Sequence, residues 1–342
     1  MICNNKEVRV LANQTAEKKD DFIWAALLHF GMNMWCDQPV KAYKDYTPEE
    51  LDLIAVADHL RFDEAVWRKV TGRMAEVGMN MVVIDVGEGI LLKSHPELSV
   101  KGSWTIDRFR AELDRLRRMG LEPIPKLNFS AAHDTWLKDY GRMLSTPEYY
   151  RVCEDVIAEV GEIFDRPRFF HLGYDEENWK CQRLCAYAVV RQGEQWWCDF
   201  LKISGFAEKH GMRPWIWSDY VWDHDEEFLR RMPRNILQSN WYYGTHFEAS
   251  KNAHRVIRCK MFGRLSDAGF DQMPCGSNFE SDGNFDALVA YCNKAIAPNR
   301  LKGFLMAPWF ATLPYREGKL VEAMDQVGAA MKVYEATSRC AR

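Results

Sequence analysis

The chain has 342 residues, of which 47% are hydrophobic and 27% are charged, a length that suits one large domain or two modest ones. Its net charge of -4 and the lack of a basic run interleaved with aromatic residues exclude nucleic acid as an expected partner. The longest apolar stretch, from Phe22 to Phe30, is far shorter than the roughly 18 residues that mark a membrane helix, so no membrane span is expected.

Short apolar runs alternate with amphipathic segments along the chain, and the alternation repeats eight times. The apolar runs predict strands over residues 22–30, 80–86, 122–129, 168–173, 213–217, 235–241, 271–275 and 302–309. Helical patterns cover residues 63–76, 106–119, 147–164, 195–210, 285–297 and 320–334, with weaker candidates at 225–232 and around Leu265.

Eight β–α pairs predict an α/β fold, a single-domain (β/α)8 TIM barrel over residues 21–342 that follows an N-terminal extension of residues 1–20. The alternative is a doubly wound open sheet. It is disfavoured because no glycine-rich turn follows the first predicted strand.

The ten cysteines are scattered and form no CxxC pair, so they predict reduced core thiols and no zinc site. We expect neither a metal nor another cofactor. The N-terminus lacks the regions of a signal peptide, which favours a cytoplasmic location for the chain as given; the alternative is an exported protein whose leader has been removed. No feature of the sequence predicts an oligomeric state.

Two adjacent carboxylates, Asp175 and Glu176, directly follow the fourth predicted strand. Side chains alternate along a strand, so both acids can face one pocket only if the chain bends, and Gly173 permits that bend. One acid could orient a substrate while its neighbour transfers a proton. The alternative is a helix N-terminus, where acidic residues are favoured by the helix dipole.

In a TIM barrel the functional groups lie at the carboxyl ends of the strands, and polar and aromatic residues gather there in this chain. Indole walls combined with carboxylates suit the apolar faces and hydroxyls of a sugar ring, so we expect a carbohydrate partner. For any single tryptophan, core packing is the alternative. The candidate binding residues are His29, Asp85, Glu88, His133, Trp217, Asp219, Trp241, Tyr242, Tyr243 and Trp309.

The stretch His171-Leu172-Gly173-Tyr174-Asp175-Glu176 resembles the His-x-Gly-Gly-Asp-Glu signature of family 20 glycoside hydrolases, the β-N-acetylhexosaminidases. The third predicted strand, Ile124-Pro125-Lys126-Leu127-Asn128, is similar to that family's Ile-Pro-Glu-Ile-Asp strand, with Lys126 and Asn128 in place of two acids. The first strand lacks the family's sugar-binding arginine, and His29 stands near that position.

This resemblance implies substrate-assisted retaining hydrolysis of a terminal N-acetylhexosamine. It implies that Asp175 orients the acetamido group and that Glu176 is the general acid/base, with a pKa held up towards neutrality. It further implies that Tyr242 or Tyr243 binds the acetamido oxygen, and that Glu88 and His133 form a hydrogen-bonded pair that steadies Asp175.

Three other functions remain open at this point. A two-carboxylate glycosidase would use Glu176 as the acid and Asp85, Glu88 or Asp219 as the nucleophile or base. A metal-dependent barrel isomerase or hydrolase would use the histidines and carboxylates of the rim as ligands. A sugar-binding barrel without activity is the third.

Overall fold

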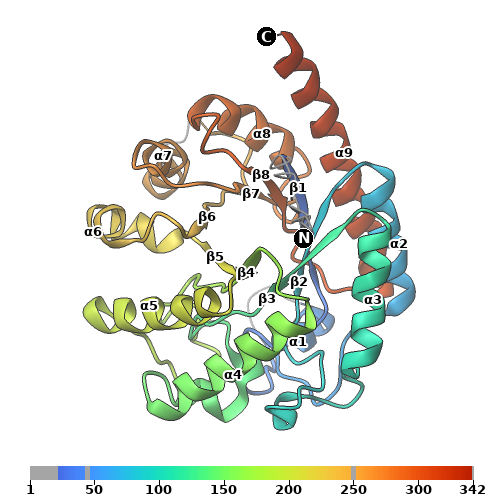
Figure 1. The fold of residues 1–342 in the computed structure, drawn as a ribbon, viewed down its shortest axis with the longest axis vertical. Coiled ribbons are helices and arrows are strands. Elements are labelled where there is room, and N and C mark those ends of the chain that lie inside the picture. The colour runs from blue at the N-terminus through green and yellow to red at the C-terminus, as the bar shows by residue number, and fades with distance from the viewer. Residues whose placement is uncertain (1–21, 43–46, 248–251, 341–342) are drawn as a thin grey trace, which may run out of the picture.

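The computed structural model describes residues 22–42, 47–247 and 252–340. Eight parallel strands form its centre, and the helices surround them (Figure 1). The expected extension of residues 1–20 lies outside the described residues, so its boundary stays a prediction. Among the described helices, none combines the length and the apolar character that crossing a membrane requires.

The strands follow one another around the barrel in the order β6-β5-β4-β3-β2-β1-β8-β7. Bridges between Gln238 and Gln272 and between Trp241 and Cys275 join the β6 and β7 segments and bring the two edges of the sheet together. The strands are β1 (Ile23–His29), β2 (Met81–Asp85), β3 (Glu122–Lys126), β4 (Phe169–His171), β5 (Arg213–Trp217), β6 (Leu237–Ser239), β7 (Cys275–Gly276) and β8 (Gly303–Met306).

Nine helices of the described chain accompany the strands: α1 (Pro48–Ile54), α2 (Glu64–Glu76), α3 (Ile106–Arg118), α4 (Pro147–Ile163), α5 (Gly193–Lys209), α6 (Asp225–Arg231), α7 (Ala253–Asp267), α8 (Asn284–Ala295) and α9 (Glu317–Cys340). Capping accounts for several of their starts. In α4, for example, Pro147 occupies the first turn while the Thr146 side chain accepts a hydrogen bond from the Tyr149 N–H.

The predicted TIM barrel is confirmed, with differences in two helices and one strand. Helix α1 was not predicted. Helix α7 is far longer than the short candidate around Leu265, and the sequence missed most of it because basic and apolar residues mix around its circumference and leave no amphipathic pattern. Strand β7 has only two residues, fewer than its apolar run suggested.

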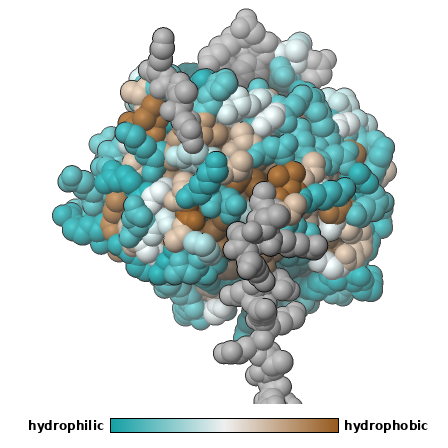
Figure 2. Space-filling model, turned by 90° about the horizontal axis from the view of Figure 1, so that it is seen from above, coloured by the Kyte–Doolittle hydropathy of each residue, from teal (hydrophilic) through white to brown (hydrophobic). Residues whose placement is uncertain are grey.

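The core has two layers, as strands covered on both faces require. One layer packs the sheet against the helices, and the other fills the barrel interior with Leu27, Val83, Ile124, Trp215 and Leu305 among its members. The outer surface seen in Figure 2 is mostly hydrophilic, with hydrophobic residues in small groups. Most of the barrel interior beneath the carboxyl ends of the strands is thus filled by apolar side chains.

Candidate active site

A cavity of about 530 Å³ opens at the carboxyl ends of the strands, and we call it the rim cavity. Its lining contains both adjacent acids and all three predicted tryptophans: Asp175, Glu176, Trp217, Trp241 and Trp309. A larger hollow of about 1070 Å³ is lined mainly by the segments before and after α1 and by the loop around Lys101. It lacks the acid pair and the indole walls, so the rim cavity is the candidate site.

The backbone after β4 turns both acids towards the rim cavity. Gly173, Tyr174 and Glu176 have φ angles of 73°, 72° and 54°, a region that non-glycine residues seldom adopt. A Cβ atom at Gly173 would lie 2.0 Å from Oδ1 of Asn128, so a side chain is excluded there. The bend expected from Gly173 is therefore present, and it carries two strained residues.

The Asn128 side chain fixes Asp175. Its Nδ2 donates a 2.7 Å hydrogen bond to Asp175 Oδ1, while its Oδ1 accepts from the backbone N–H groups of Ser130 and Tyr174 at 3.0 and 3.1 Å. The two accepted bonds set the orientation of the amide. The NH2 group of Asn128 consequently faces the carboxylate.

His133 lies between the two acids. Its Nε2 is 3.4 Å from Asp175 Oδ2 and 3.4 Å from Glu176 Oε2. Burial lowers the pKa of His133, but the two carboxylates outweigh burial and raise it to about 9. The imidazole is therefore protonated at neutral pH.

The pKa of Glu176 differs from the sequence-based expectation. Burial raises it, but the His133 imidazolium and the Arg258 guanidinium bring it below its usual value of 4.5. The expectation of a pKa near neutrality is thus wrong for this structure, in which the proton resides on His133.

Asp219 lies just after β5 and hydrogen-bonds to the loop after β4 that carries Asp175 and Glu176, which we call the acid loop. Its Oδ2 accepts a 2.8 Å hydrogen bond from the Glu176 backbone N–H, and Oδ1 has no hydrogen-bond partner among the described residues. Burial and the Asp175 carboxylate raise the pKa of Asp219 to about 8. A buried neutral acid, able to donate a hydrogen bond, therefore sits beside the pair.

Aromatic side chains form one wall of the rim cavity. Trp309 Nε1 donates a 2.9 Å hydrogen bond to the Tyr243 hydroxyl, and the Trp217 and Trp309 rings lie 5.7 Å apart. Tyr243 also stacks on Trp241, with ring centroids 5.0 Å apart. The neighbouring Tyr242 points into the outer core, where its hydroxyl donates to the His246 carbonyl, so only Tyr243 faces the cavity.

Two candidate residues, His29 and Asp85, lie beneath the rim cavity and not in its lining. Lys126 Nζ is 2.5 Å from Asp85 Oδ2, and His29 Nδ1 is 3.4 Å from the same oxygen. Burial raises the pKa of Asp85, but the Lys126 charge outweighs it and holds the pKa low. Asp85 and Lys126 thus neutralise each other in the barrel interior, which accounts for the lysine in place of an acid on β3.

The expected pair of Glu88 and His133 is wrong. The two carboxylate oxygens of Glu88 accept hydrogen bonds from the backbone N–H groups of Met32 and Asn33, at 2.9 and 3.1 Å. Burial raises the pKa of this carboxyl, which is 1% exposed. Glu88 therefore anchors the segment after β1, which supplies Met32 and Trp35 to the cavity lining.

Arg258, a residue that the sequence did not suggest, reaches the rim cavity from α7. Its guanidinium carbon lies 4.1 Å from the centre of the Trp222 ring and 4.6 Å from that of Trp241. Strand ends drew attention to the other site residues. A helix position carries no such signal.

Most of the histidines and carboxylates proposed above as metal ligands lie too far apart in the structure to bind one ion together. Only His133, Asp175 and Glu176 come together, with one ligand atom of each within 4.8 Å of the others. In this structure the raised pKa of His133 places a positive charge between the two carboxylates. The imidazolium already supplies the positive charge that two adjacent carboxylates require.

No protein-family profile matches the chain, and no curated protein matches it. Solved structures do. Dispersin B matches with a TM-score of 0.53 and 14% identity, over 79% of this chain and 95% of that one. A β-N-acetylhexosaminidase from Bacteroides fragilis matches with a TM-score of 0.58 and 12% identity, over 90% of this chain and 65% of that one.

A mutant Streptomyces plicatus β-hexosaminidase in complex with the product GlcNAc gives a TM-score of 0.61 at 12% identity, over 90% of this chain and 64% of that one. The chain thus spans just under two thirds of the length of the Bacteroides and Streptomyces proteins. The resemblance noted in the sequence is accordingly a likeness of fold to these β-hexosaminidases and to dispersin B.

Proposed function

We propose that the protein is a glycoside hydrolase that removes a terminal N-acetylhexosamine by substrate-assisted retaining hydrolysis. The observation that carries this proposal is the placement of Asp175 and Glu176 in one cavity with Trp217, Trp241 and Trp309. The shared fold with β-hexosaminidases supports the same function. A cavity of about 530 Å³ lies within the usual range for small ligands.

Asp175 would orient the acetamido group of the sugar. It would accept a hydrogen bond from the acetamido N–H and stabilise the positive charge that develops when the acetamido oxygen attacks the anomeric carbon. The Asn128 amide supports this role because it holds one carboxylate oxygen in place. The Tyr243 hydroxyl, which accepts from Trp309 Nε1 and also lies beside the Cys275 thiol, would turn its proton to the acetamido oxygen.

Glu176 would protonate the leaving oxygen and later accept a proton from water. Its proton would come from His133, whose Nε2 lies 3.4 Å from Glu176 Oε2. A sugar that expels water from the rim cavity raises the pKa of Glu176, which favours transfer of the proton from the imidazolium to the carboxylate.

None of the three acids weighed for the two-carboxylate alternative is a free carboxylate in the cavity lining. Asp85 is paired with Lys126 beneath the cavity, and both oxygens of Glu88 accept backbone hydrogen bonds. Asp219 has a pKa of about 8 and is therefore protonated at neutral pH. Because these three acids are unsuited to attack the sugar, a reaction in which the substrate supplies its own nucleophile fits better.

The test is hydrolysis of aryl N-acetyl-β-glucosaminides and N-acetyl-β-galactosaminides by the purified protein. We expect turnover by the wild type and, for aryl groups that leave poorly, a loss of about 10²-fold or more in both Asp175→Asn and Glu176→Gln. Glu280→Gln is the matched control, because Glu280 is an exposed carboxylate of the same lining. A folded wild-type protein that binds these sugars without turnover would instead indicate the non-catalytic binding barrel.

A further inference from the structure

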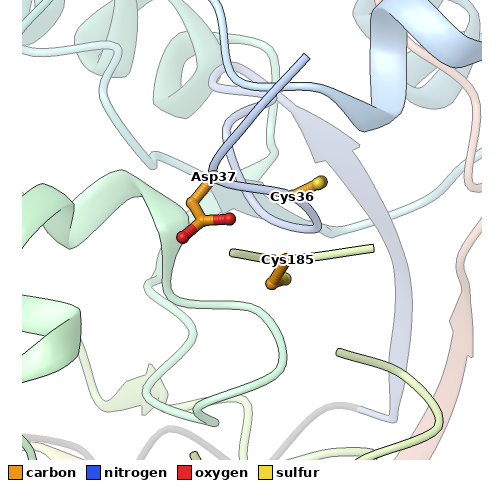
Figure 3. Close-up of side chains that lie close together, drawn as sticks. All are labelled: Cys36, Asp37 and Cys185. Carbon is orange, nitrogen blue, oxygen red and sulfur yellow. The ribbon is translucent and has the colours of Figure 1, made fainter. Parts of the chain in front are cut away.

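A cluster of Cys36, Asp37 and Cys185 lies behind the lining of the rim cavity, outside the proposed catalytic groups. Figure 3 shows Cys36 and Asp37 on the segment after β1 and Cys185 on the segment that passes beside it, after β4. One ligand atom from each residue lies within 4.8 Å of the others. The two sulfur atoms are therefore close together although the cysteines are distant in sequence.

The two thiols are bonded reciprocally to each other's segment. Cys36 Sγ donates to the Leu184 carbonyl at 2.9 Å, and Cys185 Sγ donates to the Trp35 carbonyl at 3.3 Å. Each thiol thus bonds to the residue that precedes the other cysteine. This reciprocity places the two backbones side by side and brings the two thiols near each other.

We propose that Cys36 and Cys185 form a reversible disulfide that fastens the segment after β1 to the segment after β4. Further hydrogen bonds already hold the same two segments in register: Gln38 Nε2 donates to the Leu184 carbonyl at 2.7 Å, and the Ala186 N–H donates to Asp37 Oδ1 at 2.8 Å. Because Trp35 and Leu184 line the rim cavity, the disulfide would fix the positions of these two lining residues.

Arg142 favours oxidation of the thiols over binding of a metal by the same cluster. Its guanidinium pairs with the Asp37 carboxylate, so the only oxygen ligand of the cluster is already engaged. The positive charge of Arg142 would also repel a metal cation bound there. The neighbouring Cys185 thiol lowers the pKa of Cys36 to about 7, and the Arg142 charge contributes to the same effect. Cys36 is thus the more readily ionised thiol of the two.

A peroxide is the oxidant that suits this site, because Cys36 is buried and only a small molecule can reach it when the segments open locally. The Cys36 thiolate attacks one peroxide oxygen, the O–O bond breaks, and the departing hydroxide takes a proton to become water. The Cys185 thiolate then attacks the sulfenic sulfur, forming the S–S bond and releasing the oxygen as a second water. Two thiols and one hydrogen peroxide thus give one disulfide and two waters.

The test treats the full chain with hydrogen peroxide, blocks the remaining thiols with iodoacetamide, and maps peptides by mass spectrometry without reduction. We expect a Cys36–Cys185 peptide that disappears after treatment with dithiothreitol. The bond would close a loop of about 150 residues, so oxidation should raise Tm by about 5 °C. The peptide map needs no substrate, so its result stands apart from that of the activity assay.

Cys36→Ser and Cys185→Ser should each lose the linked peptide and the rise in Tm, whereas Cys198→Ser, which removes an exposed thiol on α5, should retain both. The wild-type peptide map decides the matter even if a serine variant fails to fold. The proposal is overturned if Cys198 is oxidised while no Cys36–Cys185 peptide forms. It is also overturned if the reduced wild type binds one Zn²⁺ tightly and Cys36→Ser does not.

Discussion

Asn128 Nδ2 donates a 2.7 Å hydrogen bond to Asp175 Oδ1, and this bond joins the end of β3 to the acid loop after β4. The same amide receives the backbone N–H of Tyr174 at 3.1 Å, so one side chain holds both the strained turn and the carboxylate that follows it. Orientation of Asp175 is therefore built into the barrel before any sugar arrives.

Replacement of Asn128 should affect both activity and stability. Asn128→Ala leaves Asp175 without its donor and leaves two buried N–H groups unpaired, so we expect kcat/KM to fall by about 10²-fold and stability to fall by about 1–3 kcal/mol. Asn128→Asp keeps the acceptor but adds a like charge, so its activity should recover as pH falls. Steady-state kinetics and urea unfolding measure the two effects; unchanged kinetics in Asn128→Ala would contradict the positioning role.

The two adjacent acids should respond differently to the leaving group. Glu176→Gln should slow substrates with poor leaving groups most, because only these need protonation of the departing oxygen. Asp175→Asn should slow good and poor leaving groups alike, by about 10²–10³-fold, because it removes the charge that stabilises the transition state. A series of aryl glycosides of graded leaving-group pKa measures this, and identical slopes for the two variants would refute the assignment.

His133 should stabilise the fold at neutral pH but not at high pH. Its pKa in the folded protein, about 9, lies above its usual value of 6.5, so the contribution is complete below pH 6.5 and is lost as pH rises through 9. Between pH 6 and pH 10 the wild type should lose about 3 kcal/mol more of its unfolding free energy than His133→Gln does. Chemical denaturation at a series of pH values measures it, and parallel profiles would argue against the buried imidazolium.

Asp219 should show the converse effect of a buried acid. Its pKa is raised from 3.8 in the unfolded chain to about 8 in the folded protein. Asp219 therefore stabilises the folded protein at low pH, and this contribution to the free energy of unfolding is lost as pH rises from about 4 to 8. Asp219→Asn keeps an acceptor for the Glu176 N–H and removes the ionisation, so above pH 8 it should be more stable than the wild type by at least about 1 kcal/mol. Equal stability of the two proteins at pH 5 and pH 9 would contradict the raised pKa.

The sequence predicted the barrel because each strand is a short apolar run and the runs recur eight times. The acid pair could be found for the same reason, since it directly follows such a run. Tyr242 and Tyr243 could not be separated, because the choice depends on which face of the chain turns inward after β6.

Other parts of the site have no signature in the sequence. Glu88 binds backbone N–H groups of a loop, and a backbone partner leaves no pattern of residue types. Arg258 comes from a helix, and Cys185 meets Cys36 only because two loops run side by side. Burial alone was expected to raise the pKa of Glu176, but His133, which lies between the two acids, lowers this pKa below its usual value.

The central claim is that the acetamido group of the substrate acts as the nucleophile. The most direct measurement compares kcat/KM for aryl glycosides that carry an acetamido, a trifluoroacetamido or a hydroxyl group at the second carbon of the same sugar. Fluorine withdraws electrons from the attacking oxygen, so we predict a steep fall from the first substrate to the second and no measurable turnover of the third. Comparable turnover of the hydroxyl sugar would contradict substrate assistance and would require an enzymatic carboxylate as the nucleophile.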